Sequence, residues 1–247
     1  MCGNLLKRMF SPVAVCFFLC FFLFTACGLE TLYYLEPPTS SREILDNEDR
    51  ERDYFSFYTG DNSGVGSEFD FQGTQVYYKI FSDSSSAKSS YLSISSYNSS
   101  SDVSAAANYI INTKKYVQLN TLETSESPFI KGNRTAVEIR LNRIASYADK
   151  YPNYISVGET RYSPKRYHTV GSKKVGFEFS KEKDKDENPV PKSGDEDVDS
   201  SFSSSGSGEY YVDAWAFSQG RDNSYTFSYS RALHLGCIKI SAREYDN

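Results

Sequence analysis

The first 27 residues constrain this chain more than any other stretch, because they indicate the compartment in which the remainder folds. Lys7 and Arg8 give a basic start, residues 13–24 form an unbroken apolar run, and two small residues precede Cys27. A basic start, a short apolar centre and small residues at the end are the pattern of a secretory signal. We therefore predict that the chain after Cys27 is exported.

The stretch Phe24-Thr25-Ala26-Cys27 resembles the lipobox of bacterial lipoproteins, in the relaxed form of spirochaete-type lipoproteins. The usual pattern has an aliphatic residue three positions before the cysteine, where this chain has Phe24, with Leu23 one position earlier. The resemblance implies that residues 1–27 are a lipoprotein signal peptide and that Cys27 carries fatty acid such as palmitate. It also implies attachment to the bacterial cell envelope. The sequence does not decide between the two membranes; we predict the outer membrane, on its periplasmic or surface face.

An uncleaved transmembrane anchor is the alternative interpretation of the same stretch. A membrane-spanning helix needs about 20 apolar residues, whereas the run at 13–24 is shorter and follows Pro12. Each buried methylene of an acyl chain contributes about 0.8 kcal/mol, so several chains on one cysteine hold a protein at a membrane without a span. We therefore predict that the membrane is a partner through a lipid anchor at Cys27.

The charge of the chain argues against nucleic acid as a partner. The chain has 27 basic and 32 acidic side chains, and its first 27 residues include two of the basic and none of the acidic ones. The exported part therefore has a net charge of −7 at neutral pH. Nucleic-acid binding requires a basic surface instead.

The cysteines allow no intramolecular disulfide in the predicted mature protein. Cys2, Cys16 and Cys20 lie in the signal and Cys27 carries lipid, which leaves Cys237. Cys237 lies in the strand-like run 235–240, and a lone cysteine in such a run usually behaves as a small core residue. We predict a buried, apolar thiol.

Aromatic content and period-two patterning predict a mainly β fold for residues 53–247. The chain has 20 Tyr and 17 Phe, which favour strands. Polar and apolar residues alternate between turns rich in glycine and asparagine. The runs that follow this pattern are 69–72, 75–81, 136–142, 174–179, 210–217, 225–230 and 232–240. Residues 28–52, which include Pro37-Pro38, are predicted to be a tether and a first edge strand.

Two of these strand patterns are similar to those of fibronectin type III domains. Residues 210–230 resemble the final hairpin of that family, with a Tyr-rich strand, a Gly/Asn turn and a Ser-rich strand. The run 75–80, preceded by Phe71-Gln72-Gly73, resembles its third strand. The resemblance implies an immunoglobulin- or fibronectin type III-like β-sandwich in which the long middle stretch is a large insertion or a second β unit. No function follows from that fold.

One stretch has the pattern of a helix. Between 102 and 115, apolar residues recur at helical spacing, with Asp102 or Ser101 as N-cap. We predict one short α-helix near 102–115 that packs on the β domain. The serine-rich interval 82–101 is predicted to be mostly exposed loop.

The composition changes sharply at 181–208, where acidic, Lys, Ser and Gly residues replace apolar ones. We predict a disordered loop there. Asp195, Asp197 and Asp199 match the first, third and fifth positions of a calcium-binding EF-hand loop. The residues that the loop also needs, a glycine next and a glutamate at its twelfth position, are missing. We therefore interpret the three aspartates as a solvated acidic tract and predict no metal site.

The sequence offers no recognisable catalytic motif. His168 and His234 are its two histidines, and they form no zinc-binding pair. The chain also lacks the nucleophile elbow of α/β-hydrolases, a phosphate loop and a dinucleotide fingerprint. We predict no catalytic residue and no cofactor, with both histidines at the surface or at a sheet edge.

Two classes of function remain open. The first is a non-enzymatic binding or structural envelope protein that contacts another protein or a host surface ligand. The tyrosine-rich stretch 147–167 fits such contacts, because Tyr and Arg are favoured at interface hot spots, but it equally fits a plain sheet edge. The second is a carbohydrate-binding module or hydrolase, whose paired carboxylates would come from distant parts of the chain.

Overall fold

The computed structural model describes residues 34–40, 54–66, 69–141, 153–167, 169–170, 173–174, 176–177, 179, 190–203 and 208–242, which belong to the compact unit Tyr34–Asn247. The predicted signal peptide, Cys27 and His168 lie outside these ranges. In the part of the chain that is described, no helix is long and apolar enough to cross a membrane.

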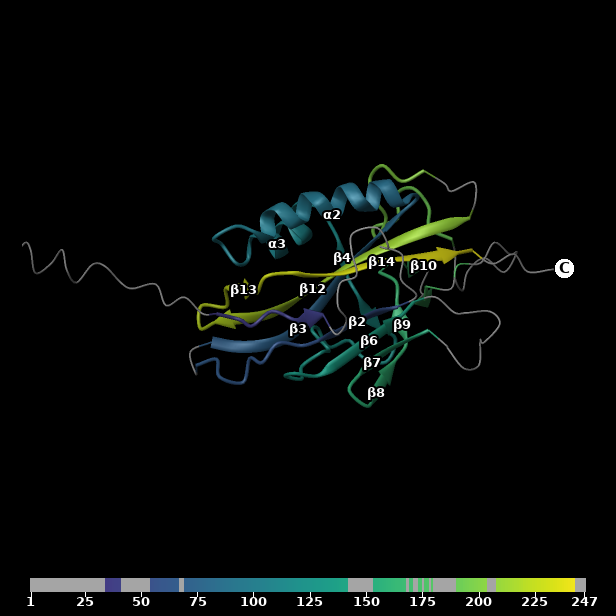
Figure 1. Ribbon diagram of the computed structural model, residues 1–247. Coiled ribbons are helices and arrows are strands. Elements are labelled where there is room, and N and C mark those ends of the chain that lie inside the picture. The colour runs from purple at the N-terminus through teal and green to yellow at the C-terminus, as the bar shows by residue number, and fades with distance from the viewer. Residues whose placement is uncertain are drawn as a thin grey trace, which may run out of the picture. The chain divides into compact units, whose positions relative to one another are not determined.

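Two antiparallel sheets contain most of the strands (Figure 1). Sheet A has the order β1-β2-β6-β7-β8, with bounds Thr39–Ser40, Phe55–Tyr58, Ala136–Arg140, Tyr154–Val157 and Thr160–Tyr162. Sheet B has the order β13-β12-β3-β4, and β14 also pairs with β12. Its strands are β3 Phe69–Phe81, β4 Val117–Gln118, β12 Glu209–Asp222, β13 Phe227–Tyr229 and β14 Leu233–Ser241. Two smaller pairs join β5 Asn120–Thr121 to β9 Pro164–Lys165, and β10 Thr169–Val170 to β11 Lys173–Lys174.

The long strands β3 and β12 form the centre of sheet B. They pair from Phe69 opposite Asp222 to Phe81 opposite Tyr211. Successive side chains of a strand point to opposite faces of its sheet. Because consecutive residues of both strands are buried along most of their length, sheet B is covered on both sides.

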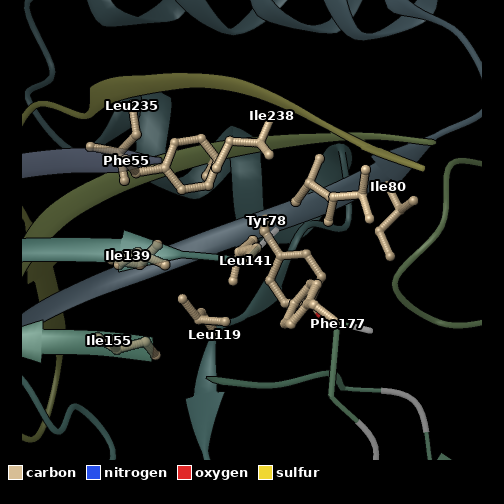
Figure 2. Packing of buried hydrophobic residues seen from close by; sticks show 14 of the residues in the cluster. Phe55, Tyr78, Ile80, Leu119, Ile139, Leu141, Ile155, Phe177, Leu235 and Ile238 are labelled. Carbon is tan, nitrogen blue, oxygen red and sulfur yellow. The ribbon is translucent and has the colours of Figure 1, made fainter. Parts of the chain in front are cut away.

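One face of sheet B packs against sheet A to form the larger core (Figure 2). Phe55 and Ile139 come from sheet A, Tyr78 and Ile238 come from sheet B, and each is at most 1% exposed. Burying a side chain of this size stabilises the fold by roughly 1.5–3 kcal/mol. The predicted mainly β, sandwich-type fold is therefore confirmed, while its finer assignment to the immunoglobulin or fibronectin type III class stays a prediction.

Helices cover the other face of sheet B and enclose a second core (Figure 1). The helical segments are α2 Ser84–Asn98, α3 Ala105–Asn108 and the π-helical turn η2 Tyr109–Thr113. Ile94 of α2 and Ile110 of η2 pack with Trp215 and Phe217 of β12. The described residues thus form three layers, with sheet B between the helices and sheet A.

Helix α2 corrects the prediction that 82–101 is mostly exposed loop. Asp83 caps the helix, because its Oδ1 accepts a hydrogen bond from the backbone N–H of Ser86 at 2.8 Å. Ala87, Ser90 and Ile94 are the buried residues of α2, at spacings of three and four. This buried stripe is hidden in the sequence because one of its three members is a serine. The described residues therefore contain two α-helices where the sequence predicted one, and the second, α3 with η2, lies inside the predicted range 102–115.

Candidate functional site

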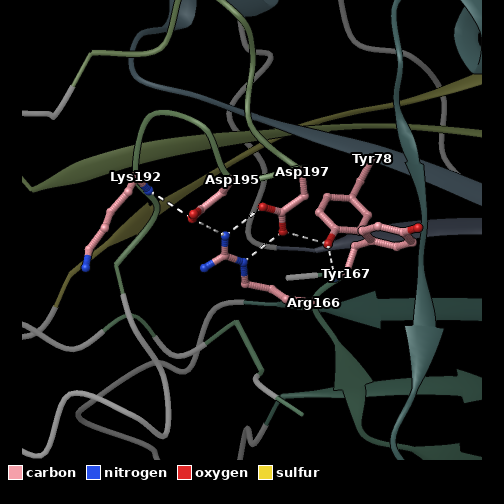
Figure 3. A network of polar contacts seen from close by, with 6 residues as sticks. All are labelled: Tyr78, Arg166, Tyr167, Lys192, Asp195 and Asp197. Atoms are coloured by element: carbon pink, nitrogen blue, oxygen red, sulfur yellow. Dashed lines mark hydrogen bonds and ion pairs between the residues drawn. The ribbon is translucent and has the colours of Figure 1, made fainter. Parts of the chain in front are cut away.

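Arg166, which directly follows β9, is the centre of a buried ion network (Figure 3). Its Nε donates a hydrogen bond to Oδ2 of Asp197 at 2.8 Å, and its Nη2 donates to Oδ1 of the same carboxylate at 2.6 Å. The same Nη2 donates to Asp195 Oδ2 at 3.1 Å. The guanidinium therefore binds Asp197 through two parallel hydrogen bonds, the geometry that makes such pairs strong and directional.

Tyr78 of β3 connects this network to the larger core. Its hydroxyl donates to Asp197 Oδ2 at 2.9 Å and accepts a hydrogen bond from the backbone N–H of Tyr167 at 2.8 Å. Burial and the neighbouring Asp197 carboxylate raise the pKa of Tyr78 well above its ordinary value. Tyr78 therefore stays a neutral hydrogen-bond donor across the physiological range of pH.

Residues 190–203 differ from the prediction that 181–208 is a disordered, solvated acidic loop. Residues 190–203 are described, whereas 181–189 and 204–207 lie outside the described ranges. Asp197 is fully buried, and Val198 and Phe202 belong to the larger core. Two backbone hydrogen bonds fix the segment to β3, from Ile80 N to Asp197 O and from Asp199 N to Ile80 O, each at 2.9 Å. Apolar residues among the charges supply the burial that composition alone did not suggest.

The three aspartates with EF-hand spacing have different partners in the structure. Asp195 and Asp197 bind Arg166, whereas Asp199 Oδ2 lies 3.9 Å from Lys79 Nζ. Across the described ranges, no group of three or more His, Cys, Asp or Glu side chains is placed to hold a metal ion. The arrangement attaches a segment to the sheet through ion pairs, which is a structural role.

A second buried polar cluster surrounds Asp213 of β12, on the helix-facing side of sheet B. Asp213 is 1% exposed. Its Oδ2 accepts hydrogen bonds from Tyr116 Oη at 2.8 Å and from Trp215 Nε1 at 3.0 Å, and its Oδ1 lies 2.7 Å from His234 Nε2. Asp213 thus has three polar partners, which compensate for removing a carboxylate from water.

His234 lies on β14, beside the rings of Tyr91 and Trp215, which also stack on each other. Its ring centroid is 4.4 Å from that of Tyr91 and 4.5 Å from that of Trp215, and 17% of its side chain is exposed. β14 pairs only with β12 among the described strands, so the predicted sheet-edge position is correct, but the side chain is largely enclosed. Sequence reasoning did not foresee its contact with Asp213.

The Asp213 cluster does not have the order of a nucleophilic triad. Ser90 Oγ lies 3.0 Å from Tyr116 Oη, and Tyr116 in turn contacts Asp213. In a Ser-His-Asp triad, histidine lies between the serine and the carboxylate. Here Tyr116 and Asp213 lie between Ser90 and His234, so the histidine has no position from which to take the proton of Ser90.

The described part of the tyrosine-rich stretch 147–167 is largely a sheet edge. Tyr154 lies on β7 and Tyr162 on β8, the outer strand of sheet A, while Tyr147 and Tyr151 lie outside the described residues. The Arg161 guanidinium lies 4.6 Å from the centre of the Tyr154 ring, and Phe129 packs edge-on to Tyr162. The alternative of a plain sheet edge therefore fits the described strands β7 and β8 of this stretch.

Local sequence signals point to only some of the residues in and around the Arg166 and Asp213 clusters. Asp213 lies inside the apolar strand 210–217, and a lone carboxylate in such a strand is a signal for a buried polar partner. Cys237 is buried on β14, as predicted. Arg166 gave no signal, because it stands in a polar stretch with Lys165 and Tyr167.

Comparison with known proteins adds no relative: no family model, no curated protein and no solved structure matches the chain.

Proposed function

We propose that this chain is an exported bacterial lipoprotein, anchored to the cell envelope by acyl chains on Cys27, whose β domain has a non-enzymatic binding or structural role. The observation that carries the proposal is the N-terminal sequence, in which a basic start and an apolar run lead to Phe24-Thr25-Ala26-Cys27. We place the protein at the outer membrane on the same resemblance.

The chemistry of the two buried clusters supports a role without catalysis. A hydrolase of the two-carboxylate type needs one acid that can give a proton and one carboxylate that is available to substrate or water. Asp195 and Asp197 are bound to Arg166, and Asp213 is bound by Tyr116 and Trp215. These carboxylates have structural partners where a hydrolase would need accessible groups.

Metabolic labelling with palmitate in a bacterium that expresses the full chain tests the anchor. We expect the wild-type protein to take up the label and to sediment with membranes. Cys27→Ala loses the label, whereas the matched control Cys20→Ala, in the apolar run, keeps it because that cysteine leaves with the signal. A wild-type protein without label, or a Cys27→Ala protein that keeps it, contradicts the proposal.

A further inference from the structure

The first described residues of the chain are fixed beside one end of sheet B. The Glu36 carbonyl accepts hydrogen bonds from Ser218 Oγ at 2.7 Å and from Asn62 Nδ2 at 3.2 Å, and the Glu36 N–H donates to Asn62 Oδ1 at 2.8 Å. Leu35 is buried, and a Cβ atom on Gly60 would lie 2.2 Å from the Glu36 carbonyl oxygen. The backbone at Glu36 is therefore held tightly against Ser218 of β12.

Ser218 lies close to the hairpin that joins β12 to β13. The two strands pair from Gln219 opposite Tyr229 to Arg221 opposite Phe227, so the turn begins a few residues after Ser218. Figure 1 shows the purple start of the described chain next to this hairpin. The described chain thus begins at the same end of the domain as the hairpin tip.

The length of the tether limits how far this end can be from a membrane. Tyr34 is seven positions after Cys27. A chain of seven residues spans at most about 25 Å, whatever its conformation. An acyl anchor at Cys27 therefore keeps Tyr34 and the neighbouring hairpin within reach of the lipid headgroups.

The hairpin tip presents aromatic side chains to solvent at this end. Tyr225 is 72% exposed and Phe227 is 51% exposed, and Tyr34 is 67% exposed. The Arg221 guanidinium lies 5.0 Å from the centre of the Tyr225 ring, and its Nη2 lies 3.4 Å from Asp70 Oδ2. Exposed aromatic rings next to a cationic group are the composition that favours the boundary between headgroups and acyl chains.

The backbone at Tyr225 adds an independent observation. Asp222 forms the turn, because its carbonyl accepts a hydrogen bond from Tyr225 N and its Oδ1 accepts from Ser224 N and Thr226 N. Tyr225 follows this turn with a φ of 64°, in the left-handed region. Glycine or asparagine normally occupies that position of a hairpin. Tyr225 thus places a bulky aromatic side chain at the tip of the hairpin, at a position where the backbone disfavours one.

We propose that the β12–β13 hairpin tip, through Tyr225, Phe227 and Arg221, inserts into the interface of the bilayer to which the chain is anchored. The inference rests on the proposed lipid anchor at Cys27 and adds a second contact to it. The anchor brings the hairpin to the membrane, the aromatic rings enter the headgroup region, and Arg221 lies among lipid phosphates. The domain is then held in one orientation, with the tethered end of sheet B at the membrane.

Fluorescence quenching by brominated lipids tests the insertion on the full, acylated protein. The chain has one tryptophan, Trp215, which is buried and common to all variants. A Tyr225→Trp variant places a probe at the tip, and Tyr167→Trp is the matched control at another exposed tyrosine. Tyr167 contacts Tyr78, which is nine residues along β3 from Phe69, or about 30 Å from the hairpin end of the strand.

Both variants are reconstituted into vesicles of phosphatidylcholine and phosphatidylglycerol with brominated acyl chains. We expect quenching of the added emission of at least twofold in Tyr225→Trp and no added quenching in Tyr167→Trp. Equal quenching, or none at the tip, overturns the insertion. The mass of the N-terminal peptide separates the two proposals. An acylated Cys27 with an unquenched tip leaves the anchor standing, whereas an unacylated Cys27 overturns both proposals.

Discussion

Arg166 Nη2 lies 2.6 Å from Asp197 Oδ1, and neither side chain is exposed to solvent. The two residues belong to segments that meet only in the folded chain, one directly after β9 and one in the segment fixed to Ile80 of β3. Because each charge compensates the other, removing one partner alone destabilises the fold strongly, since it leaves an uncompensated buried charge.

We predict that Arg166→Met lowers the free energy of unfolding by about 3–5 kcal/mol, since it leaves Asp197 buried without its counter-charge. The double variant Arg166→Met, Asp197→Leu recovers part of this loss, because it removes the uncompensated charge of Asp197. The recovery is incomplete, because the Tyr78 hydroxyl loses its acceptor and Asp195 loses its ion-pair partner. Urea unfolding followed by circular dichroism measures both. A double variant less stable than the single one would contradict the account.

Glu126→Gln is the control for this experiment. Glu126 and Lys131 form an ion pair at 2.9 Å, with 63% and 60% of their side chains exposed. A pair so exposed contributes about 0–1 kcal/mol. Its removal leaves the unfolding curve nearly unchanged, which separates the effect of burial from that of charge.

The acidic segment 190–203 shows which parts of the structure local sequence patterns can predict. Strand patterns identified most of both long strands of sheet B, because alternation at 69–72, 75–81 and 210–217 is a local signal. The turn predicted from Ser218 was wrong, since β12 continues to Asp222. The burial of Asp197 depends on Arg166, 31 residues away, and no local pattern encodes such a partner. Helix α2 was missed for a similar reason, since Ser90 becomes part of its buried face only against sheet B.

The N-cap of α2 predicts a loss of stability in acid. Hydrogen bonds donated by Ser85 and Ser86 hold the pKa of Asp83 below its ordinary value. A lowered pKa in the folded state means that the ionised cap stabilises the protein above the unfolded pKa, about 3.9, and that this contribution is lost as the pH falls through the folded pKa.

We therefore expect Asp83→Ala to lower the free energy of unfolding by about 1 kcal/mol at pH 7 and by less at pH 3. Asp83→Asn is the matched control, because its side-chain oxygen still caps the helix and does not titrate. Urea unfolding at both pH values decides the point. If Asp83→Ala lowers the free energy of unfolding as much at pH 3 as at pH 7, the ionised Asp83 side chain does not stabilise the helix as proposed.

For Tyr116 we predict the opposite pH dependence, in which stability is lost at alkaline pH. Burial and the Asp213 carboxylate raise the pKa of Tyr116 well above its ordinary value. The raised pKa means that its contribution is present below the unfolded pKa, about 10, and is lost as the pH rises through the folded pKa.

Tyr116→Phe is expected to be less stable than wild type by about 1–2 kcal/mol at pH 8, because Asp213 loses a buried hydrogen-bond donor. Its stability then falls less steeply than that of wild type above pH 10. Tyr34→Phe, at an exposed tyrosine, changes neither quantity. Equal slopes for wild type and Tyr116→Phe, measured by urea unfolding between pH 8 and pH 11, would contradict this prediction.

The left-handed backbone at Tyr225 predicts a gain in stability on substitution. Tyr225→Gly removes the strain of a φ of 64° and raises the free energy of unfolding by up to about 1 kcal/mol. The same variant binds less deeply to vesicles, because it lacks the aromatic ring. Gly220→Ala provides the contrast. Its Cβ atom would lie 2.1 Å from the Phe69 ring, so we expect this variant to be less stable than wild type. Thermal unfolding of Tyr225→Gly below the wild-type temperature would argue against strain at this position.

Mass spectrometry of the N-terminal peptide, on protein purified from the membranes of a bacterium expressing the full chain, tests the lipid anchor most directly. The account predicts that residues 1–26 are absent and that the peptide begins at Cys27 with the added mass of fatty acyl groups. An N-terminus that still contains the apolar run 13–24, or a Cys27 that carries no acyl mass, would contradict it.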